Sequence, residues 1–227
     1  MEVEIQVPDE VPVMTLPNVA FFPQALLPLQ IFEPRYRRML RDVLAGNRIF
    51  AVAGLDSGAA ESGDRFEPPH RVACLGLVRA CQKNEDGTSR VILQGLCRVA
   101  IESIVGDLPY RRIRIRALES KPGAEPGENA KLQSELSRLI RLRLRLSPDE
   151  PAGMNDLLGA VDDPEVFADI AAFNLCTNGP LKQKLLETLD VNRRLALLLK
   201  ILRSEVDTAV LRLKLRGGLP EDRISMN

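Results

Sequence analysis

The hydrophobic pattern of the chain changes period near residue 120, and this change limits the possible folds more than any other feature. Before that point the apolar runs are short, and residues 110–119, YRRIRIRALE, alternate strictly. Ile113 and Ile115 would point to one side of such a strand and the arginines to the other. After residue 120, apolar residues recur at spacings of three and four, as on one face of a helix. Strands followed by helices predict an α+β fold.

The first half reads as strands around one helix. Pro34 suits the first turn of that helix, because proline has no N–H to leave unpaired there, and Gly46 is placed to end it. Asp-Gly within residues 85–88, EDGT, predicts a tight hairpin between two β-rich runs. Twisted strands of this kind usually close into a barrel or a sandwich. The predicted strands are 12–16, 26–32, 48–55, two within 71–104, and 110–119, with a long polar loop at 56–70.

The second half opens with a proline- and glycine-rich linker, SKPGAEPGEN, at 120–129. The segment LIRLRLRL at 139–146 fits a strand or a helix, and the apolar spacing before it favours a helix. A sustained apolar stripe predicts one long final helix that Asp190 can cap. Shorter helices are expected around 154–160, 164–173 and 180–188, with Pro148, Pro151, Pro164 and Pro180 between them and Gly217 and Gly218 after the last helix. We therefore expect a strand subdomain at 1–119, the linker, a helical subdomain at 130–216 and a tail at 217–227.

Charge and aromatic content weigh against nucleic-acid binding. The 31 lysines and arginines balance 31 acidic residues, whereas a dedicated nucleic-acid binder is usually clearly basic. The chain has no Trp, and its two Tyr and seven Phe offer few stacking platforms for bases. The apolar runs are far shorter than a membrane span, and the acidic start MEVEIQVPDE does not look like a signal peptide. The four cysteines are not spaced as a zinc or redox motif, and we expect them to be reduced in a cytoplasmic protein.

The sequence lacks the usual catalytic motifs. No lysine is followed by Ser or Thr, so the phosphate-binding loop of a P-loop ATPase is missing, and no Gly-x-Ser-x-Gly elbow occurs. The one histidine, His70, is expected to be a solvent-exposed loop residue, since a zinc site with Cys74 would need two more ligands. Residues 162–165, DDPE, are typical of a helix start. A serine and a lysine from distant positions could still meet, but we expect no catalytic, metal-binding or cofactor-binding residues.

The helix that begins at Pro34 concentrates positive charge, because arginines at 35, 37, 38 and 41 lie largely off its apolar face. Such arginines are either solvated surface or contacts for an acidic or extended partner. As candidate partner contacts we select Arg35 and Arg38, with Phe21 and Phe22 as apolar anchors. Packing in the core is the favoured alternative for both phenylalanines.

Four segments carry a resemblance to a known family, in the right order along the chain. They are LPNVAFFPQALLPLQIFEPRYRRML (16–40), NRIFAVA (47–53), LGLVRACQKNEDGTSRVILQGLCRVAI (75–101) and LLETLDVNRRLALLLKIL (185–202). Together they resemble the N-terminal substrate-binding domain of the Lon family of ATP-dependent proteases. The resemblance implies a PUA-like β-barrel followed by a helical bundle. The motif residues, which look structural, are Leu16-Pro17, Phe22-Pro23, Pro28-Leu29, Glu33-Pro34-Arg35-Tyr36, Gly76, Asp86-Gly87 and Gly95-Leu96-Cys97-Arg98.

The resemblance also implies what the chain would do. Lon enzymes continue into an ATPase module and a Ser–Lys peptidase module, and neither motif set occurs here before Asn227. We therefore expect a non-catalytic module that recognises polypeptide substrates or a protein partner, through an exposed apolar patch with a basic rim or through a strand edge. Two other hypotheses remain: an RNA-binding PUA-like module, and an enzyme with an unrecognised pocket.

Overall fold

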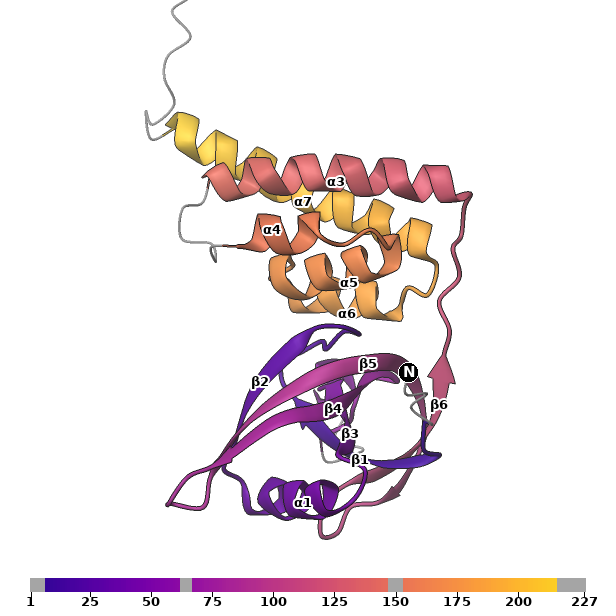
Figure 1. The fold of residues 1–227 in the computed structure, drawn as a ribbon, viewed down its shortest axis with the longest axis vertical. Helices are drawn as coiled ribbons and strands as arrows, with labels where there is room; N and C mark the ends of the chain where they lie inside the picture. Colours follow the sequence, from indigo (N-terminus) through magenta and orange to yellow (C-terminus); the bar gives the residue numbers. More distant parts are fainter. Residues whose placement is uncertain (1–6, 62–66, 147–152, 216–227) are drawn as a thin grey trace, which may run out of the picture.

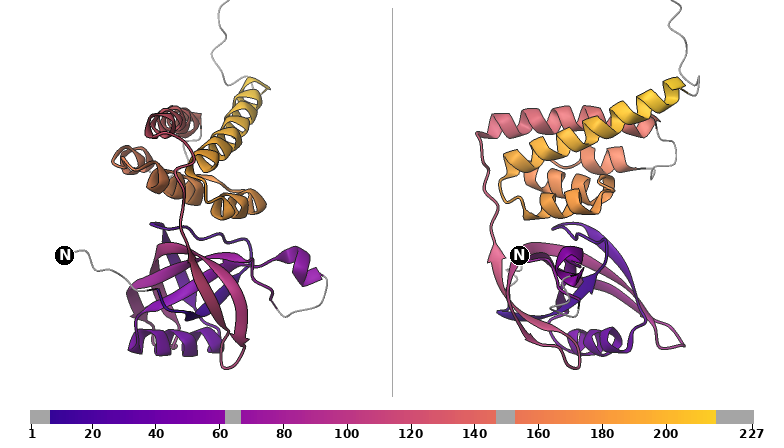
Figure 2. Two further views of the ribbon diagram at one scale, coloured as in Figure 1. Left: turned by 90° about the vertical axis from the view of Figure 1, so that its right-hand side faces the viewer. Right: turned by 180° about the vertical axis from the view of Figure 1, so that it is seen from behind.

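The strands and the helices form two bodies stacked one on the other (Figure 1). This computed structural model describes residues 7–61, 67–146 and 153–215. The strands and helix α1 form the lower body in Figure 1, and the helices from α3 onward form the upper body. Figure 2 shows the same stacking from the side and from behind. The helix stops expected at Pro148, Pro151, Gly217 and Gly218, and the tail at 217–227, lie outside the described residues.

Six strands form one curved sheet in the order β2-β5-β4-β3-β1-β6. β1 runs parallel to β3, and the other neighbouring pairs are antiparallel. β6 pairs with β5 as well as with β1. Strand pairing therefore runs from β5 through β4, β3, β1 and β6 and back to β5. The strands are β1 (Glu10–Leu16), β2 (Leu26–Ile31), β3 (Ile49–Gly54), β4 (Val72–Lys83), β5 (Ser89–Gly106) and β6 (Arg112–Leu118).

Local patterns of the first half form as their chemistry predicts. Gly87, with φ at +79°, takes the left-handed conformation that the β4–β5 hairpin turn requires. In β6, Ile113 and Ile115 are buried, and the arginines that alternate with them, at 112, 114 and 116, are exposed. The predicted loop at 56–70 differs, because it holds a short helix, α2 (Ser57–Glu61). Asp56 caps this helix, since its Oδ1 accepts a hydrogen bond from the Ala59 N–H at 3.1 Å.

Helix α1 (Pro34–Ala45) covers the end of the sheet that faces away from the other helices (Figure 1). Pro34 stands at its first turn and Gly46 follows its last residue, as expected. Its apolar face packs into the core through Tyr36, Met39, Leu40 and Val43. The arginines are left toward the outside.

The upper body contains α3 (Pro126–Leu146), α4 (Met154–Gly159), α5 (Pro164–Leu175), α6 (Gly179–Glu187) and α7 (Val191–Leu215). The segment LIRLRLRL is helical, as favoured, and α3 begins at Pro126, within the stretch expected to be a linker. The DDPE sequence starts α5, where Asp163 accepts hydrogen bonds from Glu165 N–H and Val166 N–H. Asp190 caps α7, since its Oδ1 accepts from the Arg193 N–H at 2.9 Å. Side-chain caps thus fix the starts of both helices.

A buried ionic cluster joins the two bodies. Arg98 of β5 donates to the carboxylate of Asp169 of α5 at 2.7 and 2.6 Å and to the Leu186 carbonyl at 2.9 Å. Arg194 of α7 donates to the same carboxylate at 2.8 Å and to the Ser120 hydroxyl at 2.8 Å. The three charged side chains are at most 2% exposed. Burial lowers the pKa of Arg194, and the Asp169 carboxylate opposes this shift.

Candidate functional site

The outer face of β2, β5 and β4 carries a strip of apolar side chains. The strand register places Pro28 opposite Ile92, and Ile92 opposite Ala80, so one row of the sheet surface is apolar across all three strands. Leu26 lies on the same face of β2, and it is 57% exposed, while Ile92 is 37% exposed. Phe32 follows β2 in the same alternation and is 62% exposed. We call Leu26, Pro28, Phe32, Ala80 and Ile92 the β2 strip.

β2 is also an end of the sheet. Among the described strands it pairs with β5 alone, which leaves its other side without a strand neighbour. Pro28 fits this position, because proline is confined to edge strands and bulges. An edge strand with exposed apolar side chains is a template on which a further extended segment can pair.

Basic and polar groups surround the strip. A hollow of about 550 Å³ lies over this face and is lined by residues 28–30 of β2, 80–82 of β4 and 90–92 of β5. Arg90 sits between Gln30 and Gln82 in the strand register. Arg79 of β4 donates a hydrogen bond to the side chain of Gln94. The expected combination of an apolar patch and a basic rim therefore occurs on this face of the sheet.

The arginines selected from the sequence lie on α1 and already have partners within the chain. Arg35 makes paired hydrogen bonds to Glu67 at 2.7 and 2.8 Å and a further one to Glu33 at 2.9 Å. The bond to Glu67 is the main reason that the pKa of Arg35 is raised. Arg38 is more exposed and donates to Asp42, one helical turn away, at 3.1 Å. Arg38 is therefore the more accessible of the two.

Phe21 and Phe22 are not surface anchors, and this part of the sequence hypothesis is wrong. Phe21 is 1% exposed and packs edge-on against Phe173, with ring centroids 6.2 Å apart. Phe22 is fully buried beneath the Arg98 guanidinium, which lies 5.7 Å from its ring centroid. Both rings form part of the junction between the two bodies. The favoured alternative, packing in the core, is confirmed.

The remaining candidates for chemistry are dispersed. The sequence predicted a solvent-exposed His70, but the side chain is half-buried. Its Nδ1 lies 3.9 Å from an Asp56 carboxylate oxygen. The cysteines at 74, 81, 97 and 176 carry free thiols. Over the three described ranges, no group of three or more His, Cys, Asp or Glu is arranged to hold a metal ion. Within those same ranges, no helix combines the length and the apolar character that a bilayer span requires.

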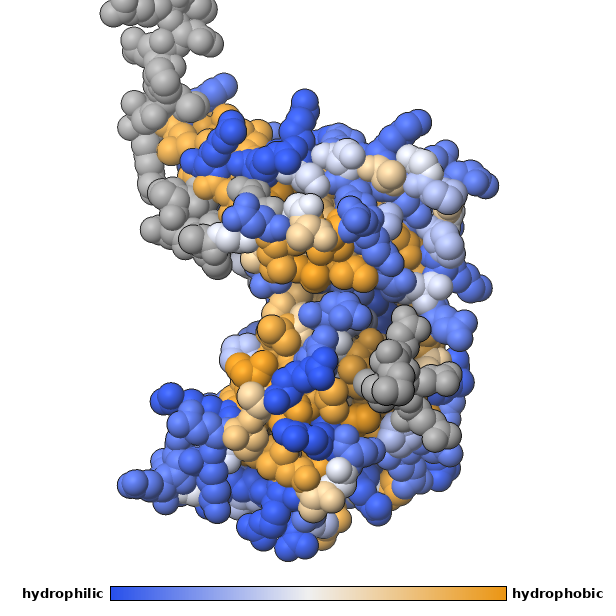
Figure 3. All heavy atoms as spheres, in the orientation of Figure 1, coloured by the Kyte–Doolittle hydropathy of each residue, from blue (hydrophilic) through white to orange (hydrophobic). Residues whose placement is uncertain are grey.

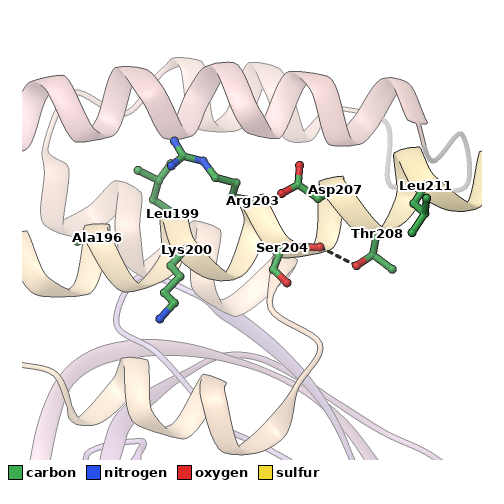
Figure 4. A pocket seen from close by; sticks show the side chains of 8 residues that line it. All are labelled: Ala196, Leu199, Lys200, Arg203, Ser204, Asp207, Thr208 and Leu211. Carbon is green, nitrogen blue, oxygen red and sulfur yellow. Dashed lines mark hydrogen bonds between the residues drawn. The ribbon is translucent and has the colours of Figure 1, made fainter.

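Another hollow, of about 490 Å³, runs along α7 and has no strand among its lining residues. Its lining mixes apolar Ala196, Leu199 and Leu211 with polar and charged side chains (Figure 4). The Thr208 hydroxyl there donates to the Ser204 carbonyl at 2.8 Å, a bond internal to the helix. Figure 3 shows apolar surface gathered over the strands and around the notch between the two bodies. The β2 strip combines apolar exposure, an open strand edge and a basic rim, so it is the strongest candidate for a binding surface.

Comparison with known families and structures agrees with this architecture. Residues 10–204 match the model of the ATP-dependent protease La (LON) substrate-binding domain. The chain belongs to this family. The first-half motifs quoted above, from Leu16-Pro17 to Gly95-Leu96-Cys97-Arg98, all fall within the matched residues.

The relatives are Lon proteases of which the chain spans about a quarter. It is 29% identical over 210 residues to a Lon protease of Xanthomonas oryzae pv. oryzae, covering 92% of this chain and 24% of that protein. It is 28% identical over 196 residues to Lon protease 2 of Myxococcus xanthus, covering 86% of this chain and 24% of the relative. These matches therefore concern the substrate-binding part of the relatives.

Two solved structures show the same fold. The N-terminal domain of a Mycobacterium avium complex Lon protease superposes with a TM-score of 0.66 at 17% identity, over 86% of this chain and 98% of that one. A Lon N-terminal domain protein from Xanthomonas campestris gives a TM-score of 0.60 at 19% identity, over 84% and 97%. The similarity covers both bodies, because the aligned share of this chain is larger than the share that either body makes up.

Sequence reasoning missed the residues of the β2 strip. Phe32 was part of a predicted strand, and Ile92 was part of the predicted hairpin, but neither was selected as a contact. The signal was present, because residues 26, 28, 30 and 32 must share one face of an extended strand. What the sequence could not show was which face of the strand would be covered.

Proposed function

We propose that this chain is a non-catalytic module that binds unfolded or extended polypeptide at the β2 strip. In this proposal the strands β5, β4, β3, β1 and β6, which pair in a circuit, form a PUA-like barrel. The helices α3 to α7 form the bundle above it. The observation that carries the proposal is the exposure of Leu26, Phe32 and Ile92 beside the open edge of β2.

The physical basis is strand addition to an open edge. An extended peptide can hydrogen-bond to backbone groups on the side of β2 that has no neighbour among the described strands, and can place alternate side chains over the strip. Burial of apolar surface contributes about 25 cal/mol per Å², so a few exposed side chains can provide useful affinity. Unfolded chains expose apolar residues that folded proteins hide, which gives selectivity for them.

The basic rim gives the surface a charge preference. Arg79 and Arg90 beside the strip favour acidic or neutral segments over basic ones. Arg38 on α1 remains a proposed contact, and so does Arg35, whose bonds to Glu67 and Glu33 would have to be shared with or replaced by the partner. Phe21 and Phe22 are not proposed as partner contacts, because both are buried. We place the module in the cytoplasm, where unfolded substrates of Lon-like proteases would occur.

A binding experiment with an intrinsically unfolded protein tests the proposal. Fluorescently labelled β-casein is titrated with the purified chain, and the affinity is compared between wild type and the double variant Phe32→Glu/Ile92→Glu. The matched control is Leu211→Glu/Leu215→Glu, which adds the same two negative charges on side chains of α7 that are 57% and 79% exposed. We expect the double variant to bind at least about tenfold more weakly, because carboxylates replace the anchors that would be desolvated. Equal binding by wild type and the double variant would remove the β2 strip from the proposal.

The non-catalytic part of the proposal has its own test. The purified chain is incubated with ATP and with casein, together and separately. We expect neither phosphate release nor peptide cleavage above the buffer control. Turnover of either substrate that survives repeated purification would contradict the proposal.

A further inference from the structure

A groove lies between α3 and α7, the two long helices of the upper body. In Figure 1, α3 lies on the side of this body away from the strands. The groove holds about 400 Å³, and it takes one wall from α3 between Glu135 and Arg145 and the other from Leu199 and Arg203 of α7. We call it the α3–α7 groove. It shares no residue with the hollow over the β2 strip, so the two surfaces can be tested separately.

Leucine side chains form the floor of the α3–α7 groove. Leu139 and Leu142 share one side of α3, because residues three apart in a helix are neighbours, and Leu199 joins them from α7. Figure 4 shows Leu199 on the side of α7 that is turned toward α3. Leu199 is 8% exposed, but Leu142 is 44% exposed. The floor therefore presents apolar surface that a docked side chain would cover.

Arginines stand along the α3 wall of the groove. Arg138, Arg141 and Arg145 are exposed and follow one another at spacings of three and four. Within the described ranges, none of these three guanidinium groups makes a hydrogen bond or an ion pair. Arg143, which lies between them in sequence, points elsewhere and donates to the Leu175 carbonyl at 2.6 Å. The described part of the chain therefore leaves the positive charge of this wall without a partner.

The one carboxylate among the described lining residues, that of Glu135, is already engaged. It accepts a hydrogen bond from Arg203 on the opposite wall, although it also stands one helical turn before Arg138. Four guanidinium groups thus line the groove against a single carboxylate. Like charges three and four residues apart in a helix repel one another, so an acidic ligand would relieve a repulsion that is built into α3.

We infer that the α3–α7 groove docks an acidic amphipathic helix of a partner protein. Such a helix carries apolar side chains at spacings of three and four, which suits a groove between two helices with a leucine floor. Its flanking carboxylates would form paired hydrogen bonds with the arginines, whose planar guanidinium groups match a carboxylate in geometry. A basic helix would meet like charges along the α3 wall.

Other occupants fit the groove less well. A nucleic acid would use the arginines, but the described lining holds no aromatic ring on which a base could stack. A bilayer surface is flat, whereas these leucines lie between two helices. A second copy of the chain, docked symmetrically, would set one groove against the other and bring the two rows of arginines together.

This docking goes beyond the proposed binding of extended polypeptide. The β2 strip would add a strand to a sheet edge, whereas the α3–α7 groove would receive a helix by side-chain packing. A chain with both surfaces would hold an unfolded polypeptide and a folded partner at the same time. Each surface can fail without the other.

The test is a fluorescence anisotropy titration of a labelled helical peptide with the full chain. The peptide carries leucines at spacings of three and four with glutamates beside them, and a lactam bridge keeps it helical. Two matched peptides have lysine in place of every glutamate, or the same residues in an order that gives no apolar face. The titration is repeated at low and at high salt.

We expect the acidic helix to bind with a dissociation constant on the order of 100 μM, because only a few side chains are covered. High salt should weaken this binding, since the arginines are exposed and their attraction is screened. The lysine peptide and the reordered peptide should each bind at least about tenfold more weakly.

Two variants of α3 and one matched control locate the binding. Arg141→Glu/Arg145→Glu should weaken it at least about tenfold, because repulsive charges replace attractive ones. The control, Arg37→Glu/Arg41→Glu on α1, reverses two exposed arginines at the same spacing and should leave the affinity unchanged. Leu142→Gln alters the floor without changing the charge or favouring another backbone conformation, and it should weaken binding about threefold. It guards against a folding defect in the double variant, and circular dichroism checks both.

Three results would overturn the inference. Equal binding of the ordered and reordered acidic peptides would show charge attraction without docking. Unchanged affinity in both α3 variants would place the helix elsewhere on the chain. The third result is tighter occupation by something else that Arg141→Glu/Arg145→Glu abolishes: an oligouridine RNA, vesicles of phosphatidylcholine and phosphatidylglycerol in equal parts, or a second copy detected by sedimentation.

The variants of the β2 strip separate this inference from the proposed function. Binding of the acidic helix that persists in Phe32→Glu/Ile92→Glu, when that variant has lost β-casein, supports two separate surfaces. Loss of both ligands in that variant would count against a second surface. Helix binding by a chain that never binds β-casein would keep this inference and reject the proposed function.

Discussion

Arg98 and Asp169, which are 71 residues apart in sequence, form a bidentate ion pair that connects the sheet to the helices. Their side chains are 2% and 1% exposed, so the pair is sealed from water. Arg194 donates to the same carboxylate, and the Leu186 carbonyl accepts the remaining Arg98 bond. The motif Gly95-Leu96-Cys97-Arg98 therefore ends in the residue that positions the upper body on the lower one.

Replacing Arg98 tests how much this pair stabilises the junction. In Arg98→Met the Asp169 carboxylate stays buried with one arginine partner in place of two, and the Leu186 carbonyl loses its donor. We expect the free energy of unfolding to fall by about 3–5 kcal/mol, the range measured when one partner of a buried ion pair is removed. Urea denaturation followed by circular dichroism measures the change.

The matched control for Arg98→Met is Arg114→Met on β6. Arg114 pairs with Glu10 at 2.8 Å, but its side chain is 55% exposed, so its loss should cost no more than about 1 kcal/mol. Similar losses of unfolding free energy in the two variants would mean that burial does not make the Arg98 ion pair more stabilising than an exposed one.

The order and type of the elements could be predicted from the sequence because they depend on local chemistry. The strict alternation of residues 110–119 produced β6, and the Asp-Gly turn produced the hairpin. Asp163 and Asp190 cap helices where their positions predicted caps. These features need only a few neighbouring residues, so tertiary contacts had little room to override them.

The contacts between the two bodies could not be predicted, because they join residues that are distant in sequence. Nothing near Arg98 indicates that Asp169 and Arg194 will meet it in the core. Phe22 and Phe32 both stand in apolar runs, yet one is fully buried and the other is 62% exposed. The difference depends on which face the helical body covers, which no local pattern records.

Two glycines of the same strand should differ sharply in their tolerance of a methyl group. A Cβ atom at Gly95 would lie 2.0 Å from the Phe22 carbonyl oxygen, whereas one at Gly106 would meet nothing within 4 Å. Because the obstacle at Gly95 is backbone, we expect Gly95→Ala to cost about 3 kcal/mol or more and Gly106→Ala less than about 0.5 kcal/mol. Thermal unfolding of the two variants side by side measures the difference, and equal melting temperatures would contradict this account of the Phe22–Gly95 contact.

Two adjacent aspartates before α5 should also differ. Asp163 Oδ1 accepts hydrogen bonds from the Glu165 N–H at 2.7 Å and the Val166 N–H at 3.3 Å. Asp163→Ala should therefore destabilise the chain by about 1 kcal/mol, the usual cost of a lost N-cap. Asp162→Ala is the matched control, since Asp162 is exposed and precedes the cap; a loss as large as that of Asp163→Ala would point to general charge effects at the helix start.

The stability of the chain should decline at alkaline pH because of a buried thiol. Burial raises the pKa of Cys74 well above its ordinary value, and Arg98 opposes this shift only in part. The folded chain therefore keeps the Cys74 proton at a pH where the unfolded chain has released it. The stabilisation is fully present below the unfolded pKa of about 8.5 and is lost as the pH rises above it, by up to about 1.4 kcal/mol per pH unit.

Comparison with Cys74→Ala isolates this contribution of the buried thiol. The variant loses packing at every pH, but it cannot lose a proton, so its free energy of unfolding should fall less steeply than that of wild type between pH 8.5 and 9.5. Urea denaturation in the presence of a reducing agent, at pH 7.5, 8.5 and 9.5, gives both curves. The gap between them should be constant up to pH 8.5 and narrow above it, because wild type approaches the variant as its advantage is lost. A gap that stays constant across all three pH values would show that the Cys74 thiol titrates alike in the folded and unfolded chains.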